Sequence, residues 1–118
     1  MQKILLLDDD VTMKSLLKTL LEMENFQVVF PSELSEKAIH KAIADEKPEL
    51  LLVDVRMESL NGLDLVAGLP ANRPYRILMT SGMDVEIECA EAGADGFLMK
   101  PYNPEELIRQ IRKLIAEN

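Results

Sequence analysis

A run of four aliphatic residues that ends on an acid constrains the fold of this chain more than any other feature of the sequence. Residues 50–53 (L-L-L-V) lie between Pro48 and a turn-rich segment, and Asp54 follows them directly. An uninterrupted apolar run of this length predicts a parallel strand that is buried on both faces. Because open parallel sheets bind ligands beyond the carboxyl ends of their strands, Asp54 is placed for chemistry. A lone aspartate here would more simply begin a turn, so the interpretation depends on what other strand ends carry.

Similar apolar runs recur along the chain and alternate with segments of helical periodicity. Further strands are predicted over residues 3–7, 26–30, 76–79 and 96–99. Helices are predicted over residues 12–24, from Ser35 to residue 47, over residues 63–69, between Asp84 and Gly93, and from Pro104 onward. Strands that alternate with helices define an α/β domain with a parallel sheet and right-handed crossovers.

Apolar spacing and capping residues set the limits of these helices. The first helix is expected to bury one face formed by Met13, Leu16, Leu17, Leu20 and Leu21. Asn25 is expected to end this helix in the left-handed conformation, and Asp84 is expected to cap the fourth helix. The Asn61-Gly62 pair predicts a turn in the loop after Asp54.

The composition limits the classes of protein to which the chain can belong. With 118 residues, of which 47% are hydrophobic, the chain has the size of a single globular domain, residues 1–118. The 21 acidic and 13 basic residues give a net charge of -8, which argues against direct binding of nucleic acid or membranes. One cysteine, Cys89, excludes an intrachain disulfide, and the N-terminal apolar run is too short for a signal peptide. We therefore expect a cytoplasmic domain.

Polar residues follow four of the predicted strands. They are Asp8, Asp9 and Asp10 after the first strand, Asp54 after the third, Thr80 after the fourth and Lys100 after the fifth. Each has an ordinary structural role when taken alone, as a helix cap, a loop cap or a solvated charge. Because the carboxyl ends of parallel strands lie at one edge of the sheet, the agreement of four strand ends predicts a site there.

The chemistry of this predicted site favours a metal ion and a phosphate. Carboxylates held close together repel one another unless one is protonated or a cation lies between them. Oxygen ligands select Mg²⁺, Mn²⁺ or Ca²⁺ rather than Zn²⁺, and the soft ligands His40 and Cys89 lie in predicted helices. A sparse carboxylate site suits Mg²⁺ with water and phosphate oxygens as further ligands. Lys100 then offers a charge and Thr80 a hydroxyl to the phosphate, and Asp54 can act as a nucleophile that forms an acyl phosphate.

In this combination of motifs the chain resembles the bacterial response-regulator receiver domains, which include single-domain chemotaxis regulators. The resemblance extends over residues 3–115. It implies a doubly wound, flavodoxin-like, five-stranded parallel sheet with strand order 2-1-3-4-5 and five helices.

The resemblance also implies roles for individual residues. Asp54 would be the phospho-acceptor. Mg²⁺, or Mn²⁺ in its place, would be bound directly by Asp9 and Asp54, through water by Asp8, and by the backbone carbonyl of Arg56. Thr80 and Lys100 would bind the phosphoryl group, and Phe97 would be the switch aromatic. The peptide bond before Pro101 would be cis and would aim Lys100 inward. Asp10 has no assigned role.

By the same resemblance the chain would act in two-component signal transduction. A sensor histidine kinase or a histidine phosphotransfer protein would donate the phosphoryl group to Asp54. The domain would not be a dedicated enzyme, although it would catalyse its own phosphorylation and dephosphorylation. The fourth helix, fifth strand and fifth helix would form an output face for a partner, for a fused effector domain or for a phosphorylation-dependent homodimer.

Three departures from the family pattern bear on these expectations. Glu58 stands where the family usually has proline, and the loss of that ring is expected to loosen the loop. Ser81 replaces a frequent alanine. The segments 62–80 and 80–100 each lack about two residues, so the third and fourth helices are expected to be trimmed or partly unwound.

Two other classes of protein remain alternatives. A Mg²⁺-dependent phosphohydrolase also uses a strand-end aspartate, but it needs an acid two residues further on, where this chain has Arg56. A phosphorylation-independent adaptor typically loses the acceptor, an acidic partner or the lysine, and this chain keeps all of them.

Overall fold

The computed structural model describes residues 1–117 as one central sheet with helices on both faces. The strands are β1 (Gln2–Leu7), β2 (Phe26–Val29), β3 (Leu50–Asp54), β4 (Arg76–Ser81) and β5 (Gly96–Met99). The helices are α1 (Val11–Met23), α2 (Glu36–Glu46), α3 (Gly62–Ala67), α4 (Glu86–Ala92) and α5 (Pro104–Ala116). All strand pairs are parallel, and the strand order is β2-β1-β3-β4-β5. The predicted α/β class and strand order are both confirmed.

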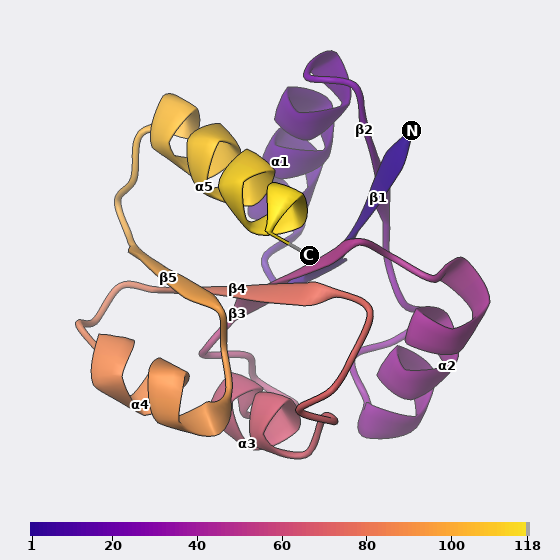
Figure 1. The fold of residues 1–118 in the computed structure, drawn as a ribbon, viewed down its shortest axis with the longest axis vertical. Coiled ribbons are helices and arrows are strands. Elements are labelled where there is room, and N and C mark those ends of the chain that lie inside the picture. Colours follow the sequence, from indigo (N-terminus) through magenta and orange to yellow (C-terminus); the bar gives the residue numbers. More distant parts are fainter. Residues whose placement is uncertain (118) are drawn as a thin grey trace.

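The two faces of the sheet carry separate halves of the core. Helices α1 and α5 cover one face, and α2, α3 and α4 cover the other (Figure 1). Along β3, Leu50 and Leu52 pack on the first face, whereas Leu51 and Val53 pack on the second. All four are essentially inaccessible to solvent. The uninterrupted aliphatic sequence of this strand therefore exists because both of its faces are covered.

Capping side chains begin two helices, and left-handed residues end two others, at the positions that the sequence indicated. Ser35 and Asn103 accept hydrogen bonds from the first turns of α2 and α5. Asn25 has a φ of 70° and Gly93 a φ of 109°, so both end their helices in the left-handed region. Helices α3 and α4 contain six and seven residues, in agreement with the short segments from which they form.

Three local predictions are wrong. Asn61 and Gly62 form the start of α3 rather than a turn, because the Asn61 side chain accepts the N–H groups of the first helical residues. Helix α4 begins at Glu86 with no side-chain cap, so Asp84 is not its N-cap. Leu16 is 60% exposed, so it lies outside the buried face of α1, which contains Leu17 and Leu21.

A polar cluster closes the end of the sheet opposite the predicted site. Asp95 accepts hydrogen bonds from Arg73 at 2.8 Å, from Arg76 at 2.9 Å and from the N–H of Ile77 at 2.8 Å. Arg76 also donates to the carbonyl oxygen of Glu117 at 2.9 Å. The cluster therefore joins β4, the turn before β5 and the end of α5, far from the carboxyl ends of the strands.

Candidate phosphoryl-acceptor and metal site

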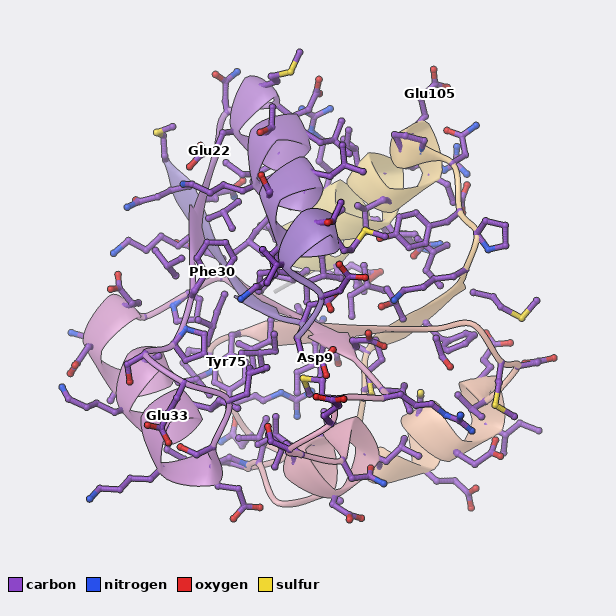
Figure 2. The ribbon with its side chains drawn as sticks, turned by 180° about the vertical axis from the view of Figure 1, so that it is seen from behind. Asp9, Glu22, Phe30, Glu33, Tyr75 and Glu105 are labelled. Carbon is purple, nitrogen blue, oxygen red and sulfur yellow. The ribbon has the colours of Figure 1, made fainter. Side chains whose placement is uncertain are left out.

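The carboxyl ends of four strands bring the predicted polar residues to one edge of the sheet. Asp8 follows β1, Asp54 is the last residue of β3, and Lys100 follows β5. Thr80 lies beside Asp54 in the register of β3 and β4. Figure 2 shows Asp9 at this edge, just below the start of α1. Residues from four separate strands therefore share one site, as the parallel topology requires.

Three carboxylates form the centre of the site. One oxygen from each of Asp8, Asp9 and Asp54 lies within 4.8 Å of the others. Asp8 is only 3% exposed, and its Oδ1 accepts the N–H of Asp10 at 2.9 Å. Asp54 Oδ1 accepts the N–H of Arg56 at 3.3 Å. Each of these two carboxylates is thus oriented by the backbone two residues further along the chain.

Lys100 is the cation that faces this cluster. Its Nζ donates to Asp54 Oδ2 at 3.2 Å. The peptide bond between Lys100 and Pro101 is cis, and the Lys100 N–H donates to the carbonyl oxygen of Ser81 at 2.7 Å. Three carboxylates against one ammonium leave the cluster with two uncompensated negative charges when all four groups are ionised.

Burial and this excess of negative charge together raise the pKa values of two groups at the site. Burial raises the pKa of Asp8 above its ordinary value, and the charge of Asp54 raises it further, whereas the Asp10 N–H and Lys100 act in the opposite direction. Burial together with the charges of Asp8 and Asp54 raises the pKa of Tyr102 to about 12. Ionised carboxylates in this site are therefore energetically unfavourable in the absence of a bound cation.

The arrangement fits a divalent cation. Its donors are carboxylate oxygens close enough to share one ion, and a cation there would offset the repulsion between them, which adds to the effect of burial on the pKa of Asp8. His40 lies in α2 and Cys89 is buried in α4, and neither belongs to the group of candidate ligands found among residues 1–117. The oxygen donors favour Mg²⁺ or Mn²⁺ over softer metals.

Thr80 and Phe97 lie on the side of the site that faces β5. Thr80 is buried, and its carbonyl oxygen accepts the N–H of Val55 at 2.9 Å. Phe97 is half-buried and packs against the core on the side of α4, and its register partner Met79 precedes Thr80 in β4. The two predicted switch residues therefore come from adjacent strands, one position apart in the register.

The β3–α3 loop, residues 55–61, forms another wall of the site. Arg56 forms an isolated antiparallel bridge with Asn61, and the Gly62 N–H donates to the carbonyl oxygen of Val55 at 2.9 Å. The Arg56 guanidinium contacts Met83 Sδ at 2.9 Å. This contact crosses a cavity of about 600 Å³ between the β3–α3 loop and the segment that precedes α4.

One contact of this loop could not be predicted from side-chain patterns. The backbone N–H of Glu58 donates to Asp9 Oδ2 at 2.7 Å. Ser59 Oγ also donates to the carbonyl oxygen of Leu34 at 3.0 Å. Glu58 thus gives the loop an anchor that proline, which has no N–H, could not provide. The only sign of this contact in the sequence is that residue 58 is not proline.

Comparison with known proteins assigns the chain to a family. The model of the response regulator receiver domain matches residues 4–112, so the chain belongs to this family. The chain is thus a receiver domain of the kind found in two-component response regulators, for which phosphorylation and Mg²⁺ binding are typical.

Named relatives agree with this assignment. The chain is 39% identical over 121 residues to the transcriptional regulatory protein CpxR of Escherichia coli (strain K12), covering 100% of this chain and 51% of that protein. It is 31% identical to the DNA-binding response regulator MtrA of Mycobacterium leprae (strain TN), covering 99% and 52%, respectively. The chain spans about half the length of these curated relatives.

Solved structures share the fold over nearly the whole chain. The BeF3-activated N-terminal receiver domain of Klebsiella pneumoniae RstA superposes with a TM-score of 0.86 at 26% identity, covering 97% of this chain and 98% of that one. The response regulator signal receiver domain from Bermanella marisrubri gives a TM-score of 0.85 at 27% identity, covering 96% of this chain and 97% of that one.

Among the residues described here, no helix is long and apolar enough to cross a membrane.

Proposed function

We propose that this chain is a phosphorylation-controlled signalling domain whose acceptor is Asp54. The phosphoryl donor is a phosphohistidine of a sensor histidine kinase or of a histidine phosphotransfer protein. The observation that carries the proposal is the position of the Asp54 carboxylate, which lies between Lys100 at 3.2 Å and the carboxylates of Asp8 and Asp9. A nucleophile, a cation and two further acidic ligands thus meet at the carboxyl ends of the strands.

The transfer is a substitution at phosphorus. A carboxylate oxygen of Asp54 forms the new P–O bond, and the P–N bond of the donor breaks with its electron pair moving to the imidazole. Lys100 balances the negative charge of the transferred oxygens, and the Thr80 hydroxyl donates to one of them. The product is an acyl phosphate on Asp54. Attack by water on its phosphorus breaks the P–O bond to Asp54, releases inorganic phosphate and restores the carboxylate. The chain thus catalyses its own phosphorylation and dephosphorylation.

Mg²⁺, or Mn²⁺ in its place, belongs to the same site. Asp9, Asp54 and the backbone carbonyl of Arg56 would hold it directly, and Asp8 through water. Bound there, the cation supplies positive charge to the transferring phosphoryl oxygens. The oxygen-only donor set and the approach of three carboxylate oxygens to within 4.8 Å of one another support this role.

The phosphorylated state is transmitted through Thr80 and Phe97 to the face formed by α4, β5 and α5. When Thr80 moves toward the phosphoryl group, it vacates space into which Phe97 rotates. Exposed apolar side chains near this face support contact with a partner, notably Ile87 and Met99. The partner is an output protein, a fused effector domain or a second copy of the chain. The relatives named for transcription and DNA binding favour a gene-regulatory output.

Neither alternative class has a specific observation in its favour. A phosphohydrolase would need an acid in place of Arg56, whose guanidinium instead contacts Met83. An adaptor that no longer needs phosphorylation would not require the intact set of three carboxylates and one lysine. The compartment consistent with this function is the cytoplasm, with residues 1–118 as one receiver domain.

The test is incubation of the protein with phosphoramidate, followed by intact mass spectrometry with and without EDTA. We expect one phosphate on the wild-type chain only when Mg²⁺ is present, none on Asp54→Asn, and little on Lys100→Ala. Asp10→Asn is the matched control, because asparagine also caps α1 and Asp10 has no proposed role. An unlabelled wild type that also fails to bind beryllofluoride would favour the adaptor, and rapid turnover of a phosphate ester would favour the hydrolase.

A further inference from the structure

Asp9 differs from the other two carboxylates of the site in how it is held. Asp8 and Asp54 accept N–H groups from residues two positions further along the chain. Asp9 instead accepts the N–H of Glu58, which is 49 residues away, at 2.7 Å. The shortest of these three hydrogen bonds is thus the one that joins two separate loops of the site.

The β3–α3 loop is built to hold this donor in place. The bridge between Arg56 and Asn61 closes the loop, and a Cβ on Gly62 would lie 2.6 Å from the carbonyl oxygen of Asp54. Glu58 lies in the middle of the closed segment. Ser59 Oγ also donates to the carbonyl oxygen of Leu34, outside the closed segment. The closure of the loop therefore limits the directions that the Glu58 N–H can take.

We propose that the main-chain N–H of Glu58 is a positioning group for the metal site. It occupies Oδ2 of Asp9 and restricts rotation of the carboxylate, while Oδ1 keeps its lone pairs for the cation. The side chain of Glu58 is exposed, so the proposed role belongs to its main-chain N–H alone. A proline at this position, which is usual in the family, has no N–H and cannot make the bond. This chain therefore orients a metal ligand by a contact that proline-bearing receivers lack.

The inference rests on the proposed binding of Mg²⁺ at this cluster. Hydrogen-bond partners behind a metal ligand fix its orientation, and their loss typically weakens metal binding about 10- to 100-fold. This effect acts before any phosphoryl transfer takes place.

The experiment compares Mg²⁺ binding by isothermal titration calorimetry in Glu58→Pro and Glu58→Ala, with no phosphoryl donor present. Both substitutions remove the carboxylate, but only proline removes the N–H. We expect Glu58→Ala to bind like wild type and Glu58→Pro to bind about 10-fold more weakly. Ser59→Ala loosens the loop while keeping the N–H, and it is expected to bind within about 2-fold of wild type.

The outcomes separate this inference from the proposed function. Equal affinities of the proline and alanine variants would overturn the positioning role, while the metal site itself would stand. A wild-type chain that binds no Mg²⁺ would instead overturn the site on which the inference rests. If Glu58→Pro does not fold, an ester in place of the 57–58 peptide bond, introduced with the α-hydroxy analogue of alanine, removes only the N–H. The same 10-fold loss is expected there, and unchanged affinity would contradict the proposal.

Discussion

Gly62 is the residue whose replacement by alanine should damage the site most directly without removing a functional group. A Cβ at this position would lie 2.6 Å from the carbonyl oxygen of Asp54, 2.9 Å from Val55 Cα and 3.0 Å from the carbonyl oxygen of Val55. The closest pair would have to separate by about 0.8 Å to reach the 3.4 Å at which ordinary contact begins. All three neighbours are backbone atoms, so no side-chain rotation can relieve the overlap.

The expected cost follows from two opposing effects. Overpacking of a well-packed region costs about 1–3 kcal/mol, and contacts with fixed backbone belong to the upper half of that range. Alanine also regains up to about 1 kcal/mol as a better helical residue at the start of α3. The net loss for Gly62→Ala is therefore about 2 kcal/mol. With a urea m-value of roughly 1.5 kcal/mol/M, the unfolding midpoint should fall by about 1 M.

Urea unfolding followed by circular dichroism measures this loss, and Gly68→Ala is the matched control. A Cβ on Gly68 would lie 3.6 and 3.7 Å from its nearest neighbours, which is ordinary contact. Gly68 has a φ of -85°, so alanine fits there and should be neutral or stabilising by up to about 1 kcal/mol. If Gly62→Ala unfolds at the same urea concentration as Gly68→Ala, the close packing of α3 against the acceptor strand is not as described.

Three further predictions concern charge and the switch. Burial raises the folded-state pKa of Asp8 above its ordinary value of 3.8, so ionised Asp8 destabilises the metal-free fold. Asp8→Asn should therefore raise the urea midpoint at pH 7, and this gain should disappear as the pH falls through the raised pKa toward 3.8; a gain that persists at low pH would refute the assignment. Asp95→Ala should lower the free energy of unfolding by about 3 kcal/mol, because it leaves Arg73, Arg76 and the N–H of Ile77 without their shared acceptor. A loss under about 1 kcal/mol would show that the cluster contributes little to stability. Crystal structures with and without beryllofluoride should show Thr80 displaced toward the site and Phe97 rotated inward, whereas unchanged positions of both would exclude this switch.

Much of the fold follows from the sequence because burial leaves a simple pattern. Strands covered on both faces need uninterrupted apolar residues, which is why β1 and β3 were visible as aliphatic runs. The acids after these two strands, together with Lys100 after β5, indicated one sheet edge because parallel strands end on the same side. The grouping of Asp8, Asp9 and Asp54 could thus be predicted before any distance was known.

The predictions from the sequence fail where the local structure depends on tertiary contacts. Leu16 continues the apolar stripe of α1 in the sequence, but no tertiary contact buries it, and it remains 60% exposed. Asp84 has the chemistry of a helix cap, yet the first α-helical hydrogen bond of α4 runs from the Cys89 N–H to the carbonyl oxygen of Val85, which moves the start of the helix past it. The bond from Glu58 to Asp9 uses a backbone N–H that every residue except proline offers, so no side-chain pattern can announce it.

The most direct test of the central claim is to locate the phosphoryl group on the chain. Borohydride reduces an acyl phosphate of aspartate to homoserine, and peptide mass spectrometry identifies the position. This matters because oxygens of Asp8, Asp9 and Asp54 lie within 4.8 Å of one another, so an intact mass alone does not distinguish them. After treatment with phosphoramidate and Mg²⁺, we predict homoserine at position 54 alone, and none when EDTA is present. Conversion at Asp8 or Asp9, or labelled protein with no conversion at position 54, would contradict the account.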